Sequence, residues 1–180
     1  VEAESAMKIA KDLGAKEHKL VEVNLKDVAD SALTDGSRPL SQDRSPGDIR
    51  DSGIPDTYVP ARNAVLLSIA LSYAESVGAR EIHVGAHATD YPGYPDCRPE
   101  FIHAFQEMAR LGTRTGVEDK PITVEAPLIE FDKARIIRLG EKLGVPFEKT
   151  RSCYSDSEKA CGRCDSCRLR LEGFRKAGLE

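Results

Sequence analysis

Four cysteines gathered near the end of the chain constrain this sequence more than any other feature. The last three follow a C-x2-C-x2-C spacing, and the full set is Cys153, Cys161, Cys164 and Cys167. Four thiolates complete a tetrahedral shell around Zn²⁺, and because no position stays open for water, such an ion is structural. Gly162 suits the tight backbone turn between the second and third ligands. We therefore predict one structural zinc ion per chain.

Other uses of these thiols remain open at this point. An iron–sulfur cluster takes similar ligands, and spacing alone does not separate it from zinc. A disulfide scaffold is disfavoured, because the chain has five cysteines and no secretory signal pattern. A redox C-x-x-C motif normally uses two thiols at a strand-to-helix turn rather than four. Thiols available for a metal point to the cytoplasm.

Bulk composition is that of an ordinary globular protein. Of 180 residues, 40% are hydrophobic and 31% charged, which is enough apolar material for a real core. No apolar run is long enough to span a membrane. A net charge of −4 gives no general attraction to nucleic acid.

Periodicity predicts alternating strands and helices. Helices are expected at 2–13, 60–77, 99–111, 132–143 and 167–177, and strands at 20–25, 81–86 and 122–126. The alternation indicates the α/β class, a mostly parallel sheet with helices on both faces. The helix at 60–77 is apolar nearly all round, so we expect it to be central, with Pro60 in its first turn. We predict an α/β nucleotide and substrate domain over 1–149 and a zinc-binding tail over 150–180.

The loop after the second predicted strand is the best candidate for a ligand site, because ligands of open α/β sheets bind at the carboxyl ends of strands. In this loop Asp90 or Asp96 could hold Mg²⁺ or a cationic substrate edge. Arg98 precedes a helix and could receive an anion together with backbone N–H groups. Tyr91 and Tyr94 could stack on a heterocycle. Alternatively, Asp96 caps the following helix and the tyrosines cover the end of the sheet.

A second candidate lies at the start of the helix at 60–77. Arg62 and Asn63 are the strongly polar residues of its first turn, which invites an anion at the helix N-terminus. The alternatives are a surface salt bridge for Arg62 and a local cap for Asn63. In the loop after the second predicted strand, Cys97 stands beside an arginine that could lower its pKa. No partner base is evident, so an inert structural cysteine is favoured.

Among the histidines, His83 lies in a predicted strand and is expected in the core. His87 stands at the end of that strand and is the histidine most worth following.

Four stretches together resemble the 7-cyano-7-deazaguanine synthase family, which forms preQ0 in queuosine biosynthesis. They are 31–35, 55–63 with its Thr-Tyr-Val-Pro-Ala-Arg-Asn core, 89–101 with Gly-Tyr-Pro-Asp-Cys-Arg, and 150–170 with the cysteines. The resemblance covers nearly the whole chain and implies an adenine nucleotide alpha hydrolase-like, Rossmann-like fold. It implies an ATP- and Mg²⁺-dependent ligase that joins ammonia to 7-carboxy-7-deazaguanine through an acyl-adenylate and then dehydrates the amide.

The resemblance also assigns roles to residues. The four cysteines match the family's structural zinc ligands. The third stretch would face the deazaguanine, with Asp90, Asp96 and Arg98 as catalytic residues, and Tyr91 and Tyr94 binding substrate beside Asp96 and Arg98. The second stretch, with Arg62 and Asn63, would lie near the nucleotide.

One departure from the family pattern concerns the phosphates of ATP. The family's Ser-Gly-Gly-x-Asp-Ser loop, whose N–H and O–H groups cradle pyrophosphate, does not occur in these 180 residues. The sequence opens at Val1 directly in a helical pattern, and we expect the loop to belong to a piece that precedes it. A chain of these residues alone is expected to bind zinc without turning over ATP.

Two rival functions remain. A related pyrophosphatase-type enzyme that thiolates tRNA would share the core, and a zinc-ribbon module would bind nucleic acid through the tail. The tail carries Arg163, Arg168, Arg170, Arg175 and Lys176, but acidic residues alternate with them, which is typical of a solvated helix. We therefore expect small-molecule partners, no membrane and no direct nucleic acid. The oligomeric state is open, with a homodimer as one option.

Overall fold

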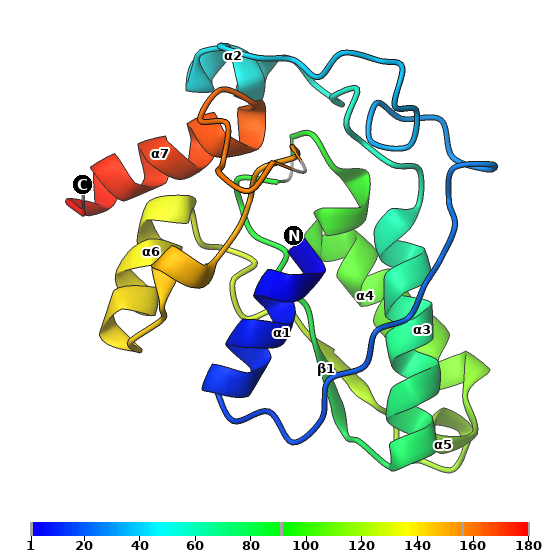
Figure 1. Ribbon diagram of the computed structural model, residues 1–180. Helices are drawn as coiled ribbons and strands as arrows, with labels where there is room; N and C mark the ends of the chain where they lie inside the picture. The colour runs from blue at the N-terminus through cyan, green and yellow to red at the C-terminus, as the bar shows by residue number, and fades with distance from the viewer. Residues whose placement is uncertain (1, 91, 156, 180) are drawn as a thin grey trace. The chain divides into compact units, whose positions relative to one another are not determined.

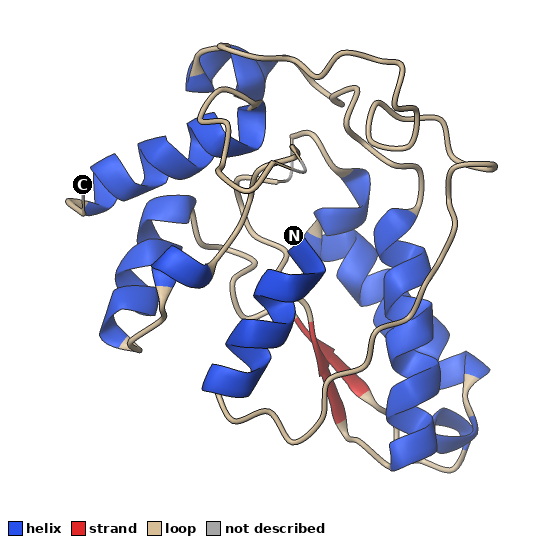
Figure 2. Ribbon diagram, in the orientation of Figure 1, coloured by secondary structure: helices blue, strands red, loops and turns tan. Residues whose placement is uncertain are grey.

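The structure divides the chain into two compact units. It is a computed structural model that describes residues 2–90, 92–155 and 157–179. The first unit joins Val1–Asp51 to Lys133–Glu180, and the second unit is Ser52–Asp132. Figure 1 follows the chain from end to end, and Figure 2 separates its helices from its strands. Within the described ranges both strands belong to the second unit, whereas the first unit is helical.

The second unit is built on a short parallel sheet, as the alternating pattern predicts. Strand β1 (Glu81–His83) pairs with β2 (Thr123–Glu125), with Ile82 opposite Val124 in the register. The chain between the strands forms the 3-10 helix η1 (Pro95–Cys97), α4 (Pro99–Gly112) and α5 (Arg114–Val117). Such a crossover is what two parallel neighbours require.

A side chain of α4 covers the outer edge of β2. The amide of Gln106 accepts a hydrogen bond from the backbone N–H of Val124 at 2.6 Å and donates one to the carbonyl of Ile122 at 3.1 Å. On its other edge, β2 bonds to the backbone of β1 and its neighbours. Because unpaired edge groups invite further strands, Gln106 protects this part of the edge.

Helix α3 (Arg62–Val77) packs one face on the sheet and α4. The buried cluster consists of Leu67, Leu71, Ala74, Ile82, Ile102, Phe105, Ala109, Ile122 and Val124. The prediction that α3 is central because it is apolar nearly all round is wrong in part, since Leu66 and Val77 are 50% and 56% exposed in the described chain. In the described chain the two-stranded sheet and α4 offer the helix one apolar surface, which its buried residues cover.

The first unit is held by packing between α6 (Lys133–Lys142) and α7 (Asp165–Ala177). Gly173 allows their close approach, because a Cβ there would lie 2.9 Å from the Cβ of Lys133 and 3.0 Å from Cδ1 of Ile137. The unit also contains α1 (Glu2–Asp12), α2 (Pro46–Asp51) and the 3-10 helix η2 (Phe147–Lys149).

Three local predictions are wrong. Residues 20–25 form no strand, and Leu20 is 76% exposed, because no described strand lies beside them to accept their backbone hydrogen bonds. His83 is exposed rather than in the core, since the β1 residue that faces inward is Ile82. Pro60 lies before α3 instead of in its first turn, and Ala61 between them has a left-handed φ of 54°.

The long polar segment at 26–57 is mostly loop, but it contains local order. Ser31 is 1% exposed, and its backbone N–H donates to the hydroxyl of Thr34. That hydroxyl in turn donates to the carbonyl of Ala29 at 2.6 Å. Such side-chain-to-backbone bonds stabilise turns without a helix or strand.

No helix in the described part of the chain is long and apolar enough to cross a bilayer.

Candidate functional site

Two segments singled out from the sequence, 55–63 and 89–98, lie against each other in the second unit. The hydroxyls of Thr57 and Tyr94 are 3.0 Å apart, and the rings of Tyr58 and Tyr94 have centroids 6.3 Å apart at 57°. Gly93 lies so close to Pro55 that a Cβ would stand 3.1 Å from the proline Cδ. The two motifs therefore form one site.

The closest link between the segments joins Asp96 to Asn63. The Asp96 carboxylate accepts a hydrogen bond from the backbone N–H of Asn63 at 2.9 Å. The Asn63 side-chain amide donates to the carbonyl of Asp96 at 3.0 Å and to Sγ of Cys97 at 3.2 Å. Asp96 is 7% exposed. It therefore caps α3, and the alternative that it caps the helix following it is wrong.

The N-terminus of α3 thus already holds an anion, which is a carboxylate of the chain itself. The backbone N–H and the side-chain amide of Asn63 both donate hydrogen bonds to Asp96, within the protein. Arg62 is half-buried, and its positive charge lies near enough to Cys97 to act on that thiol. Of the two residues predicted at this helix start, Arg62 carries a positive charge, whereas the donors of Asn63 bond to Asp96 and Cys97.

Asp90 is placed by the turn that opens the second segment. Its carbonyl accepts hydrogen bonds from the backbone N–H groups of Gly93 at 3.2 Å and Tyr94 at 2.9 Å. Its carboxylate lies 3.3 Å from Nε2 of His87, a mostly buried ring. The sequence pointed to both residues separately, and the structure brings them together.

One more predicted residue of this segment, Arg98, lies at the start of α4. Arg98 is exposed and directly precedes α4, and its side chain makes no cap bond to that helix. Tyr91 lies outside the described residues.

Cys97 is a protonated, buried thiol. Burial raises its pKa to about 12, and the negative charges of Asp90 and Asp96 act in the same direction. The hydrogen bond from Asn63 and the charge of Arg62 oppose this shift to a smaller extent. The predicted inert cysteine is therefore favoured over a nucleophile.

We expect Cys97 to resist iodoacetamide in the folded protein at about pH 8, because a thiol with a pKa near 12 is ionised in about one molecule in ten thousand there. Since the folded pKa is raised from 9.0, this thiol stabilises the fold below that value, and the contribution is lost as the pH rises from about 9 to about 12. Timed alkylation with peptide mapping measures the rate. A rate within about threefold of that in the urea-unfolded chain would contradict the expectation.

The cysteine cluster lies in the first unit. All five cysteines are free thiols, and the four Sγ atoms of Cys153, Cys161, Cys164 and Cys167 lie within 4.8 Å of one another. Tetrahedral zinc with bonds of about 2.3 Å needs sulfur atoms about 3.8 Å apart. Small side-chain shifts would therefore close a shell around one ion.

Backbone N–H groups surround these sulfurs. Cys161 donates to Sγ of Cys153 at 3.3 Å, and Cys164 donates to Sγ of Cys161 at 3.3 Å. The N–H groups of Cys164 and Arg163 lower the pKa of Cys161 to about 6, whereas burial raises that of Cys167 to about 12. A thiolate beside buried thiols is stabilised by a cation, so the donor set fits a metal ion.

A loop of the first unit anchors the cysteine cluster through contacts that the sequence pattern does not predict. Gln42 forms an antiparallel bridge with Cys164. The Asp43 carboxylate accepts from Nε of Arg163 at 2.9 Å, and Arg44 donates from Nε to Asp165 at 3.1 Å. These partners lie about 120 residues apart, so no local pattern reveals them.

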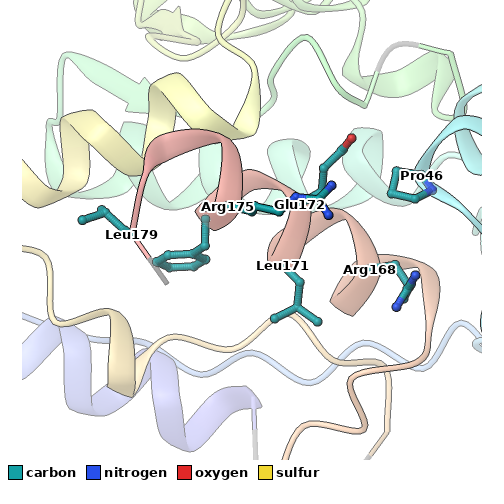
Figure 3. A pocket seen from close by; sticks show the side chains of 7 residues that line it. Pro46, Arg168, Leu171, Glu172, Arg175 and Leu179 are labelled. Atoms are coloured by element: carbon teal, nitrogen blue, oxygen red, sulfur yellow. The ribbon is translucent and has the colours of Figure 1, made fainter.

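Two further cavities border α7. One of about 540 Å³ is lined by Arg168, Leu171, Arg175 and their neighbours, and it contains none of the predicted site residues (Figure 3). The other, of about 610 Å³, reaches Cys153 and Cys167.

Comparison with known proteins gives one consistent result. The family model described as queuosine biosynthesis protein QueC matches residues 1–178. Three curated relatives named 7-cyano-7-deazaguanine synthase are each 53% identical to the chain and match 99% of it. They come from Thermosynechococcus vestitus, Azoarcus sp. and Trichodesmium erythraeum, and the match covers 76%, 77% and 80% of their own lengths.

Proposed function

The chain belongs to the QueC family of queuosine biosynthesis proteins, and on that premise we propose that it is an ATP-dependent ligase that makes 7-cyano-7-deazaguanine. The substrates are 7-carboxy-7-deazaguanine, ammonia and ATP with Mg²⁺. A carboxylate is a poor electrophile, so its oxygen is first joined to AMP with release of pyrophosphate. Ammonia then displaces AMP to give the amide. A second activation lets the amide oxygen leave with AMP, and loss of two protons from nitrogen completes the nitrile.

The observation that carries this proposal is the joining of segments 55–63 and 89–98 into one site. These are two of the stretches on which the resemblance to the family rests, and Thr57, Tyr58 and Gly93 help to hold them together. The site offers aromatic rings, carboxylates and guanidinium groups. A flat heterocycle with N–H donors and one carboxylate calls for this combination of groups.

Each side chain has a definite part in the proposal. The ring of Tyr94 stacks on the deazaguanine, with Tyr91 as a second substrate contact. The carboxylate of Asp90 accepts hydrogen bonds from the N–H groups of the heterocycle, and His87 holds that carboxylate in place. Arg98 binds the substrate carboxylate through its planar fork of donors and keeps it oriented for adenylation. Arg62 lies toward the nucleotide and balances phosphate charge.

For the cysteine cluster we propose one structural Zn²⁺ ion per chain. The short spacing of the sulfurs supports a single ion, because a multi-iron cluster stands between its ligands and holds them farther apart. With four sulfur ligands the ion has no open position for substrate, so it stabilises the first unit and takes no part in the chemistry.

The proposal also covers the protein's location in the cell and its partners. We place the protein in the cytoplasm, where thiols stay reduced and the small-molecule substrates are available. Neither a membrane nor direct contact with nucleic acid is required, and a homodimer is compatible with the proposal.

An activity assay with the products identified by mass spectrometry tests the function. The Ser-Gly-Gly-x-Asp-Ser loop is absent from the sequence, so the zinc-loaded chain is extended at Val1 by the residues preceding the matching position in the Thermosynechococcus vestitus relative. With ATP, Mg²⁺, ammonia and 7-carboxy-7-deazaguanine, we expect 7-cyano-7-deazaguanine and AMP. AMP formation that depends on a different acid, with no nitrile, would overturn the substrate assignment.

A further inference from the structure

Helix α3 lacks a capping group of its own. The first N–H groups of any helix have no partner within the helix and need an external acceptor. Ala61 occupies the N-cap position, has no side-chain oxygen and adopts a left-handed φ of 54°. The acceptor comes instead from Asp96, 33 residues away, which takes the N–H of Asn63. The start of α3 therefore depends on the second segment.

The dependence is mutual. The Asn63 amide returns hydrogen bonds to the backbone carbonyl of Asp96 and to Sγ of Cys97. This exchange has the logic of a capping box, in which two residues satisfy each other's backbone groups. Here it is built between two segments rather than along one helix. Because Asp96 is 7% exposed, its carboxylate is used inside the protein.

We propose that Asp96 and Asn63 are positioning residues, which lock the segment at 89–98 to the start of α3 and do not touch the substrate. Tyr94 stands two residues before Asp96, and Arg98 stands two residues after it. The bonds between Asp96 and Asn63 therefore position both proposed substrate contacts. The assignment rests on the proposed function and replaces the catalytic role that the sequence suggested for Asp96.

The chemistry of the two roles differs in one respect that can be tested. A cap needs an acceptor oxygen, which the side-chain amide of asparagine supplies as well as a carboxylate does. A group that binds Mg²⁺ or the substrate's N–H donors through its charge is disabled by the same change. Asp96→Asn should therefore preserve a positioning role, and Asp96→Ala should destroy it.

The test compares Asp96→Asn, Asp96→Ala and Asn63→Ala with the unmodified zinc-loaded chain. Two readouts are used, the alkylation rate of Cys97 by iodoacetamide and the affinity for 7-carboxy-7-deazaguanine by calorimetry. Asn24→Ala is the matched control, because it removes an exposed amide that bonds only locally. Circular dichroism and zinc content verify that each variant is folded.

We expect Asp96→Ala and Asn63→Ala to speed alkylation and weaken binding by about tenfold each, as loss of a cap and its partner bonds implies. Asn24→Ala should stay within about threefold of the unmodified chain in both readouts, and Asp96→Asn within about threefold in affinity. Because Asp96→Asn also removes a negative charge that raises the pKa of Cys97, its alkylation rate is compared with that of Asp96→Ala, which lacks the same charge, and should be slower. Equal loss of affinity in Asp96→Asn and Asp96→Ala, with Cys97 still protected in both, would overturn the proposal.

The two readouts separate this inference from the proposed function. If the unmodified chain does not bind 7-carboxy-7-deazaguanine, the substrate assignment fails. The alkylation rates still test whether Asp96 and Asn63 hold the segment at 89–98 in place, because this measurement needs no ligand. Unchanged protection of Cys97 in both alanine variants would then refute it.

Discussion

Removal of zinc is expected to unfold the region around the cysteine cluster and to lower the stability of the whole chain. In its described residues the segment from Cys153 to Cys167 contains no strand or helix before α7 begins at Asp165, so we expect the metal to contribute much of its stability. Structural zinc contributes an apparent 10–16 kcal/mol in isolated fingers, and we expect about 4 kcal/mol here because Arg44 and Asp43 also anchor the segment. That corresponds to a fall in Tm of about 8–16 °C.

The measurement compares metal content, Tm and hydrogen exchange before and after chelation. Cys164→Ser should bind zinc weakly, and the backbone amides of residues 153–167 should lose their protection from hydrogen exchange. Cys97→Ser is the matched control, because it removes the one cysteine outside the cluster and should keep full zinc. Equal zinc content and Tm in the two variants would show that the cluster is not the metal site. Iron in place of zinc in the purified protein would favour the cluster alternative.

Arg98→Ala is expected to weaken binding of 7-carboxy-7-deazaguanine about 100-fold, or about 2.7 kcal/mol, because it removes the proposed partner of the substrate carboxylate. The sharp readout is a comparison with 7-deazaguanine, which lacks that carboxylate. Its affinity should stay within about twofold. Arg98→Lys keeps the charge but loses the fork of donors, so we expect an intermediate loss of about tenfold.

Arg110→Ala serves as the control for this prediction, because it removes an exposed arginine from the far end of the same helix. Equal weakening of both ligands by Arg98→Ala would contradict a contact with the carboxylate. It would indicate that Arg98 acts through the shape of the loop.

Features with a strong local pattern could be predicted from the sequence. The helix at 99–111 is found at Pro99–Gly112, since a proline at its start and an apolar stripe define it without help from distant residues. The parallel pairing of the strands followed from the alternation of elements. The cysteines converge as expected, because C-x2-C-x2-C keeps three of them close in any compact fold.

What could not be predicted depends on partners far along the chain. The segment at 20–25 has the composition of a strand, but a strand exists only where a neighbour accepts its hydrogen bonds. The sequence offers Asp96, as the alternative to a ligand site, a cap on the helix that follows it, whereas its carboxylate accepts a hydrogen bond from Asn63 in α3, 33 residues earlier. The anchoring of Arg163 by Asp43 is likewise invisible in sequence, because charged residues in loops carry no periodicity.

The proposed activity is tested most directly by following nitrogen from ammonia into the product. The extended, zinc-loaded chain is supplied with ¹⁵N-ammonia, ATP, Mg²⁺ and 7-carboxy-7-deazaguanine, and the products are resolved by mass. We expect 7-cyano-7-deazaguanine that carries the label in its nitrile, with AMP formed in step with it. AMP and pyrophosphate without labelled nitrile, from folded protein with full zinc, would contradict the proposed activity.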